Sequence, residues 1–214
     1  MSITQHTQQI KDCGIIAILR GGFSVSDVLA VADALVTNGV TVLEITLNSP
    51  AAYAALPALR GRLGMSALVG AGTVRTLDDW TRAIDAGAAF TVAPNFDPAV
   101  ARVAVERGLL HIPGVATPSE AVAAANAGCT LQKLFPADAL GGPAYLKALR
   151  APLDDIDFVP VGGITVENMP GYLRAGAVAV GMGGSLIPSQ AWSPAGIAAL
   201  SQAARAAFTG GTGS

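Results

Sequence analysis

The sequence predicts an α/β protein of the (β/α)8 or TIM-barrel class, built as a single domain over residues 1–214. The first observation is a glycine that recurs roughly every 20–25 residues just before a short apolar run, as in repeated structural units. The second is that these runs are almost continuously apolar, which is typical of parallel strands buried on both faces. The third is an amphipathic stretch after each run. Eight such units favour a closed barrel over an open doubly wound sheet.

The expected strands and helices follow this period along the chain. Several helix starts are marked by residues that cap or begin helices, such as Asp97 before Pro98 and Thr117 before Pro118. We expect strands at 15–19, 42–47, 67–71, 89–93, 109–112, 130–135, 158–161 and 177–182, with helices at about 25–38, 50–62, 76–86, 97–107, 117–127, 143–150, 167–175 and 194–208.

The composition is that of a globular protein that acts on a small molecule. The net charge of −2 provides no basic surface that would attract nucleic acid or a membrane. The two cysteines, Cys13 and Cys129, have neither the number nor the spacing of a disulfide framework or a zinc site. We find no signal-peptide pattern and no apolar run of about 18 residues, so we expect a cytoplasmic protein. Only the ends, at about 1–10 and 209–214, are expected to be loose.

Lys133 is the most unusual residue within an expected strand. It interrupts the apolar run LQKLFP at 131–136, whereas Lys11 and Lys147 lie where solvent reaches them easily. Because burial of an ammonium group is costly, an interior lysine has a lowered pKa and a neutral, nucleophilic amine. Such an amine is what a Schiff-base enzyme requires.

Glu44 is the second candidate catalytic residue. Alternation along its strand places Leu43 and Ile45 on one face and Glu44 and Thr46 on the other, which we expect to be the barrel interior. A carboxyl group there can carry the protons that a carbinolamine and an enamine both need. The structural alternative is a buried Glu–Lys or Glu–Arg ion pair that fixes the register of the barrel. The combination of Glu44 with Lys133 favours catalysis, because perturbed ionisable pairs cluster at functional sites.

Other polar residues stand where the expected strands end, which is where a barrel builds its active site. Arg20 ends the first strand, Thr73 follows the third and Pro94 follows the fourth. Arg20 fits either a salt bridge at the barrel mouth or a contact to a substrate carboxylate or phosphate. His111 is interpreted as a core or supporting histidine, and it has no part in the proposed chemistry.

Two glycine-rich turns follow the last two expected strands, VGGI at 161–164 and GMGGS at 181–185. Glycines allow backbone amides to approach a phosphate, and the start of a short helix adds a favourable dipole. The loops after strands 7 and 8 are the usual phosphate site of such barrels. One GG pair is a weak signal, whereas two in these places indicate a phosphate cradle.

A series of motifs, in order over about 14–188, resembles the family of 2-keto-3-deoxy-6-phosphogluconate and 2-keto-3-deoxy-6-phosphogalactonate (KDPG/KDPGal) aldolases. The resemblance implies a class I aldolase on a (β/α)8 barrel, usually a homotrimer and without a metal. It would cleave a phosphorylated 2-keto-3-deoxy sugar acid to pyruvate and glyceraldehyde 3-phosphate. The motifs are ILRG at 18–21, EITLNSP from Glu44, GAGTV at 70–74, APN at 93–95, PGVATPSE at 113–120, LQKLFPA at 131–137, VGGI at 161–164 and GGSLIP at 183–188.

The same resemblance implies a role for each candidate residue. Lys133 would form the Schiff base, Glu44 would be the general acid and base, and Arg20 and Thr73 would contact the pyruvate part of the substrate. The implied substrate-binding set is completed by Pro94, Phe135 and Val161, together with Gly162, Gly163, Gly184 and Ser185 as the phosphate cradle.

Two departures from the gluconate pattern favour the galactonate branch. Asn48 stands where the gluconate enzymes tend to have an arginine, and Val161 stands where they tend to have a hydroxyl residue. Since a valine cannot hydrogen-bond a C4 hydroxyl, selectivity between C4 epimers should relax or invert. Gluconate activity, or use of both epimers, is the nearest alternative. A phosphosugar isomerase or epimerase without a Schiff base, and a non-catalytic phosphosugar-binding protein, are the others.

Overall fold

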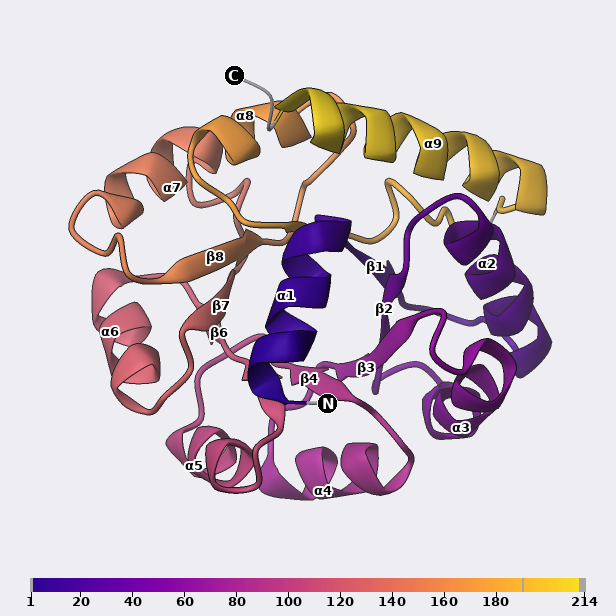
Figure 1. The fold of residues 1–214 in the computed structure, drawn as a ribbon, viewed down its shortest axis with the longest axis horizontal. Coiled ribbons are helices and arrows are strands. Elements are labelled where there is room, and N and C mark those ends of the chain that lie inside the picture. The colour runs from indigo at the N-terminus through magenta and orange to yellow at the C-terminus, as the bar shows by residue number, and fades with distance from the viewer. Residues whose placement is uncertain (1, 190, 212–214) are drawn as a thin grey trace.

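The structure, a computed structural model, describes residues 2–189 and 191–211. Strands and helices alternate along the chain, and the helices form a ring around the strands (Figure 1). The strands are almost entirely buried, as their apolar sequences require. They are β1 (Ile15–Leu19), β2 (Val42–Thr46), β3 (Leu68–Gly72), β4 (Phe90–Val92), β5 (Leu110–Ile112), β6 (Gly114–Val115), β7 (Leu131–Leu134), β8 (Asp157–Pro160) and β9 (Val180–Met182).

These strands form two parallel sheets, so the prediction of one eight-stranded sheet is met only in part. One sheet has the order β5-β4-β3-β2-β1-β9 and the other has the order β6-β7-β8. Pro113 separates β5 from β6, because proline has no N–H to donate to a ladder. The backbone nevertheless continues across this break, where Lys133 N–H donates to the Pro113 carbonyl at 2.8 Å. At the other junction a single parallel bridge joins Val161 to Gly181.

The predicted starts of α5 and α6 are confirmed, whereas α3 begins at Ala52, two residues later than predicted, with no side-chain cap. Thr117 caps α6 and forms a capping box with Glu120, and Asp97 accepts from two N–H groups at the start of α5. The helices are α1 (Ile3–Cys13), α2 (Val25–Thr37), α3 (Ala52–Leu63), α4 (Leu77–Asp85), α5 (Pro98–Glu106), α6 (Pro118–Asn126), α7 (Gly142–Arg150), α8 (Met169–Arg174) and α9 (Pro194–Gly211).

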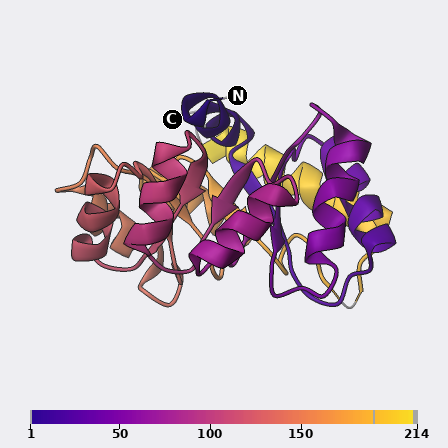
Figure 2. The same cartoon turned by 90° about the horizontal axis from the view of Figure 1, so that it is seen from below.

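Helix α1 overturns the prediction that residues 1–10 are loose. Ser2 and Gln5 form a capping box at its start, and Ile10 is fully buried. The helix crosses one face of the ring, against the amino ends of the strands (Figures 1 and 2). At the other terminus α9 continues through Gly211, so 209–211 are also helical rather than loose. The remainder of that predicted segment, 212–214, lies outside the described residues.

The inner face of β3 is shaped by glycines that make room for neighbouring side chains. A side chain at Gly70 would overlap the ring of Phe90, and one at Gly72 would overlap the carboxyl group of Glu44. Phe90 is fully buried and Glu44 almost so. The sequence GAG therefore lets an aromatic ring and a carboxyl group lie against the same strand.

Candidate active site

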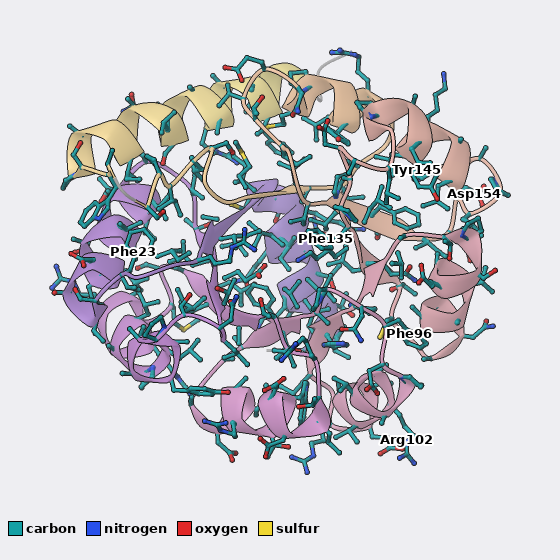
Figure 3. The ribbon with its side chains drawn as sticks, turned by 180° about the vertical axis from the view of Figure 1, so that it is seen from behind. Phe23, Phe96, Arg102, Phe135, Tyr145 and Asp154 are labelled. Atoms are coloured by element: carbon teal, nitrogen blue, oxygen red, sulfur yellow. The ribbon has the colours of Figure 1, made fainter. Side chains whose placement is uncertain are left out.

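A cavity of about 440 Å³ lies at the carboxyl ends of the strands. Figure 3, seen from the side opposite to Figure 1, places Phe135 near the centre of the ring, with Arg102 and Asp154 toward its outside. Every residue predicted for the site lines this cavity: Arg20, Glu44, Thr73, Pro94, Lys133, Phe135, Val161, Gly162, Gly163, Gly184 and Ser185.

Lys133 extends from β7 into this cavity and is only 7% exposed. Its Nζ atom lies 4.8 Å from the centroid of the Phe135 ring. Burial lowers the pKa of Lys133, the charge of Glu44 opposes this decrease, and the charge of Arg20 adds to it. The amine therefore has the environment that favours its neutral, nucleophilic form.

Glu44 lies on β2 and is 2% exposed. Burial raises the pKa of its carboxyl group, against the lowering effects of Lys133 and Arg20. Within residues 2–189 and 191–211, no salt bridge within 4.0 Å involves Glu44, Lys133 or Arg20. The structural alternative of a buried ion pair is therefore not what the structure contains, and the carboxyl group is free to exchange protons within the cavity.

Arg20 and Thr73 line the cavity from the ends of β1 and β3. Arg20 is exposed, which suits recognition of a substrate carboxylate. Thr73 has φ +61°, and in the part of the chain that the structure describes it is the only non-glycine residue with a positive φ. A β-branched residue in the left-handed region is strained, and such strain concentrates at functional sites.

The carbonyl groups of the loop that follows β8 are used in hydrogen bonds within the protein. Gly162 and Gly163 adopt φ values of +97° and +79°, which an ordinary residue rarely adopts. Four successive carbonyls, from Val161 to Ile164, accept hydrogen bonds from the surrounding structure. Their donors are Ala137 N at 2.8 Å, Asp138 N at 3.1 Å, Asn168 Nδ2 at 2.8 Å and Ser185 Oγ at 2.6 Å, respectively.

The N–H groups of the same loop are left available. Within the described residues, the backbone nitrogens of Gly163 and Ile164 donate to no protein acceptor, and neither do those of Gly184 and Ser185 after β9. Groups of free N–H donors on glycine-rich loops bind anions, phosphate above all. The Ser185 hydroxyl joins the two loops through its bond to Ile164. The two loops are therefore joined to each other, and their free N–H groups are of the kind that anion-binding sites use.

Further residues line the cavity without having been predicted for it. Ile18 lies on β1 two residues before Arg20, so alternation along the chain could have identified it. Thr165 and Ser189 lie on loops, where no sequence signal marks them. His111 is absent from the cavity lining: its Nδ1 lies 2.9 Å from Thr91 Oγ1, and burial lowers the pKa of the ring to about 4.

The described residues contain no group of three or more His, Cys, Asp or Glu side chains placed to hold a metal ion. Nor does any helix among them have the length and apolarity to span a bilayer. The charged side chains that line the cavity are those of Lys133, Glu44 and Arg20, and free N–H donors lie beside them. These groups can bind a substrate that has an anionic group at each end, and the amine can attack a carbonyl that lies between the two ends.

The family model of KDPG and KHG aldolases matches residues 7–202. The chain belongs to the KDPG and KHG aldolase family. A probable 2-dehydro-3-deoxy-6-phosphogalactonate aldolase of Rhizobium meliloti (strain 1021) is 40% identical over 173 residues, covering 80% of this chain and 81% of that protein. A 2-dehydro-3-deoxy-phosphogluconate aldolase of Treponema pallidum (strain Nichols) is 36% identical over 190 residues, covering 89% of this aldolase and 88% of the relative.

Solved structures of aldolases are similar as well. A KDPG aldolase from Legionella pneumophila, solved with pyruvate captured at low pH as a covalent carbinolamine intermediate, superimposes with a TM-score of 0.82. It is 31% identical, and the match covers 91% of this aldolase and 93% of that chain. The α/β fold of parallel strands is thus shared with a carbon–carbon lyase.

Proposed function

We propose that this aldolase is a class I enzyme that cleaves 2-dehydro-3-deoxy-6-phosphogalactonate to pyruvate and D-glyceraldehyde 3-phosphate. The observation that carries the proposal is the position of Lys133, buried with a lowered pKa beside Glu44, in a cavity whose rim carries free N–H groups. The carbinolamine captured in the Legionella pneumophila relative supports the same chemistry.

In the proposed mechanism, the neutral amine of Lys133 attacks the C2 ketone of the substrate and forms a carbinolamine. Glu44 supplies the proton with which water leaves, which gives an iminium that can accept electrons. Glu44, directly or through one water, then takes the proton of the C4 hydroxyl as the C3–C4 bond breaks. Glyceraldehyde 3-phosphate leaves, C3 of the enamine is protonated, and hydrolysis of the iminium frees pyruvate and Lys133.

The two ends of the substrate would be held by the two kinds of anion-binding group. Arg20 and Thr73 would bind the carboxylate, and the loop N–H groups at Gly163 and Gly184 would bind the phosphate. Holding both ends fixes C2 against the amine and C4 against Glu44, which makes the reaction effectively unimolecular.

The choice of the galactonate epimer rests on two side chains of the cavity. Asn48 and Val161 both line it, and Val161 offers only methyl groups next to the phosphate loop. A site without a hydrogen-bonding partner for one C4 configuration loses the means to select it. Similar relatives carry both the galactonate and the gluconate name, so use of both epimers is the alternative.

Cleavage of the two C4-epimeric substrates, measured side by side with a lactate dehydrogenase-coupled assay for pyruvate, tests the function and the epimer together. We expect both to be cleaved, with the higher kcat/KM for the galactonate. A higher kcat/KM for the gluconate would contradict the epimer assignment. Pyruvate release from neither would contradict the aldolase and favour a phosphosugar isomerase or a binding protein.

The proposal extends to the architecture of the protein. The hydrogen bonds at Pro113 and the bridge between Val161 and Gly181 support a single (β/α)8 barrel domain, in which β5 and β6 are two parts of one strand. A homotrimer is proposed from the resemblance alone, whereas a cytoplasmic location is proposed from the two free cysteines, Cys13 and Cys129. Analytical ultracentrifugation tests the trimer, and a molar mass in solution equal to that of one chain would contradict it.

A further inference from the structure

We infer that Thr46 and Ser49 are positioning residues that hold the backbone on both sides of Arg20. The observation is a chain of hydrogen bonds from the Gly21 amide, through both hydroxyls, to the Leu19 carbonyl. The inference rests on the proposed function, in which Arg20 binds the substrate carboxylate.

The hydrogen-bond chain runs between two neighbouring strand ends. Gly21 N–H donates to Ser49 Oγ at 3.1 Å, and Ser49 Oγ lies 3.0 Å from Thr46 Oγ1. Thr46 Oγ1 in turn lies 3.5 Å from the Leu19 carbonyl oxygen. The register of β1 and β2, with Leu19 opposite Ile45, brings these groups together.

The two ends of the chain fix the direction of its hydrogen bonds. A backbone N–H can only donate and a carbonyl can only accept. Ser49 therefore accepts from Gly21 and donates to Thr46, and Thr46 donates to Leu19. Each hydroxyl makes one bond as acceptor and one as donor. The chain is complete and spans the two peptide groups that flank Arg20.

Arg20 would gain from such support, because in the part of the chain that the structure describes its side chain forms no salt bridge. That side chain is also exposed. Gly21 follows with φ +124°, a conformation open mainly to glycine, so the backbone turns sharply after the arginine. The backbone therefore sets the point from which the Arg20 side chain enters the cavity, and the two hydroxyls hold that backbone.

A purely structural interpretation is that the hydroxyls stabilise only the turn after β2, where Ser49 N–H donates to the Thr46 carbonyl at 2.9 Å. The two interpretations differ in what happens when Arg20 is removed. Ser49 is the cleaner probe, because Thr46 lines the cavity and Ser49 does not. If Ser49 acts through Arg20, its replacement matters only while Arg20 is present.

The test is a double-mutant cycle of Ser49→Ala and Arg20→Gln. We expect Ser49→Ala to raise the KM for the sugar acid about fivefold with little change in kcat. The pyruvate concentration that gives half-maximal borohydride trapping should increase by the same factor. The same substitution in the Arg20→Gln background should change neither quantity further. Ser49→Thr, which keeps the hydroxyl, should restore both. Thr46→Val should behave as Ser49→Ala does.

Ser201→Ala is the control, because it too removes the hydrogen bond of a serine hydroxyl, from Ser201 Oγ to the Ile197 carbonyl at 2.7 Å, at a residue that does not line the cavity. It should leave KM unchanged. An equal effect of Ser49→Ala with and without Arg20, or no effect at all, would overturn the inference. So would an Arg20→Gln variant with unchanged KM. Failure of the proposed function is seen in a separate measurement: the wild-type protein would then form no borohydride-trapped adduct on Lys133 at saturating pyruvate.

Discussion

The two ends of the strands each carry a cavity, and the comparison shows that size does not locate the chemistry. The cavity at the amino ends, under α1, is the larger at about 550 Å³, and its lining includes His6, Arg60 and the exposed Met65. The cavity at the carboxyl ends has about 440 Å³ and contains every predicted site residue. Volume reflects how elements pack, whereas function follows from the groups that converge.

The two ends also differ in how their charges are arranged. Near the amino ends, Lys11 pairs with Asp157 of β8 at 2.6 Å, with both side chains about one-third exposed. At the carboxyl ends, Lys133 and Glu44 shift each other's pKa and Arg20 lowers both, and within the described residues none of the three forms a salt bridge. The ion pair of Lys11 and Asp157 joins α1 to β8. The ionisable groups at the carboxyl ends have no such partner in the described part of the chain and are available for reaction.

The largest contrast is expected for the same substitution at two lysines. Lys133→Met should abolish the borohydride adduct with pyruvate and lower kcat by about 10⁵-fold or more, because no other amine lies in the cavity. Lys147→Met, on the exposed side of α7, should leave both unchanged. Steady-state kinetics and intact-protein mass spectrometry check this pair. A Lys133→Met enzyme that still cleaves the substrate would contradict the assignment of Lys133 as the reactive amine.

Glu44→Gln should lower kcat by about 10²- to 10⁴-fold, since proton transfer at two steps is lost. The adduct with pyruvate should still form, but slowly. Adduct formation requires the neutral amine, so it increases as pH rises through the pKa of Lys133. Because the Glu44 charge holds that pKa up, its removal should lower the pKa further and move the increase to lower pH.

The pH dependence of borohydride trapping measures this shift, with the wild type as its control. A profile displaced to higher pH in Glu44→Gln would contradict the electrostatic link between the two groups. Unchanged turnover would remove Glu44 from the mechanism altogether.

Thr73→Gly separates stability from activity at the carboxyl ends. Relief of the left-handed conformation should raise the free energy of unfolding by up to about 1 kcal/mol, after the entropy cost of glycine. Loss of the hydroxyl should lower kcat/KM about tenfold. Urea denaturation and kinetics check the two effects. A destabilised variant would show that the strain at Thr73 has been overestimated.

The smallest effect is expected at the amino ends. Lys11→Met should lower the free energy of unfolding by about 0.5 kcal/mol, the usual size for a partly exposed ion pair, and leave kcat/KM unchanged. Thermal unfolding in low and high salt checks the first expectation. A change in kcat/KM would mean that α1 communicates with the site, contrary to the comparison.

The strands and the reactive residues were predictable because both follow from local patterns. Continuous apolar runs indicated buried parallel strands, and a lysine in such a run has few explanations. The GG pairs stood in the loops that bind phosphate in barrels, and the free N–H groups at Gly163 and Gly184 agree with that interpretation.

Other features depend on packing that no local pattern shows. Helix α1 was missed because ITQHTQQIKDC is mostly polar, although Ile3, His6, Ile10 and Cys13 have helical spacing. Pro113 has no N–H to donate, and whether this interrupts the sheet depends on which strand lies beside it. The hydrogen-bond chain from Ser49 depends on the register of β1 and β2, which the sequence does not reveal.

The most direct test of the central claim is borohydride reduction of the wild-type protein in the presence of pyruvate, followed by peptide mapping. We expect one pyruvate-derived adduct, located on Lys133. A protein that stays unmodified, or an adduct on Lys11 or Lys147, would contradict the proposed Schiff-base mechanism.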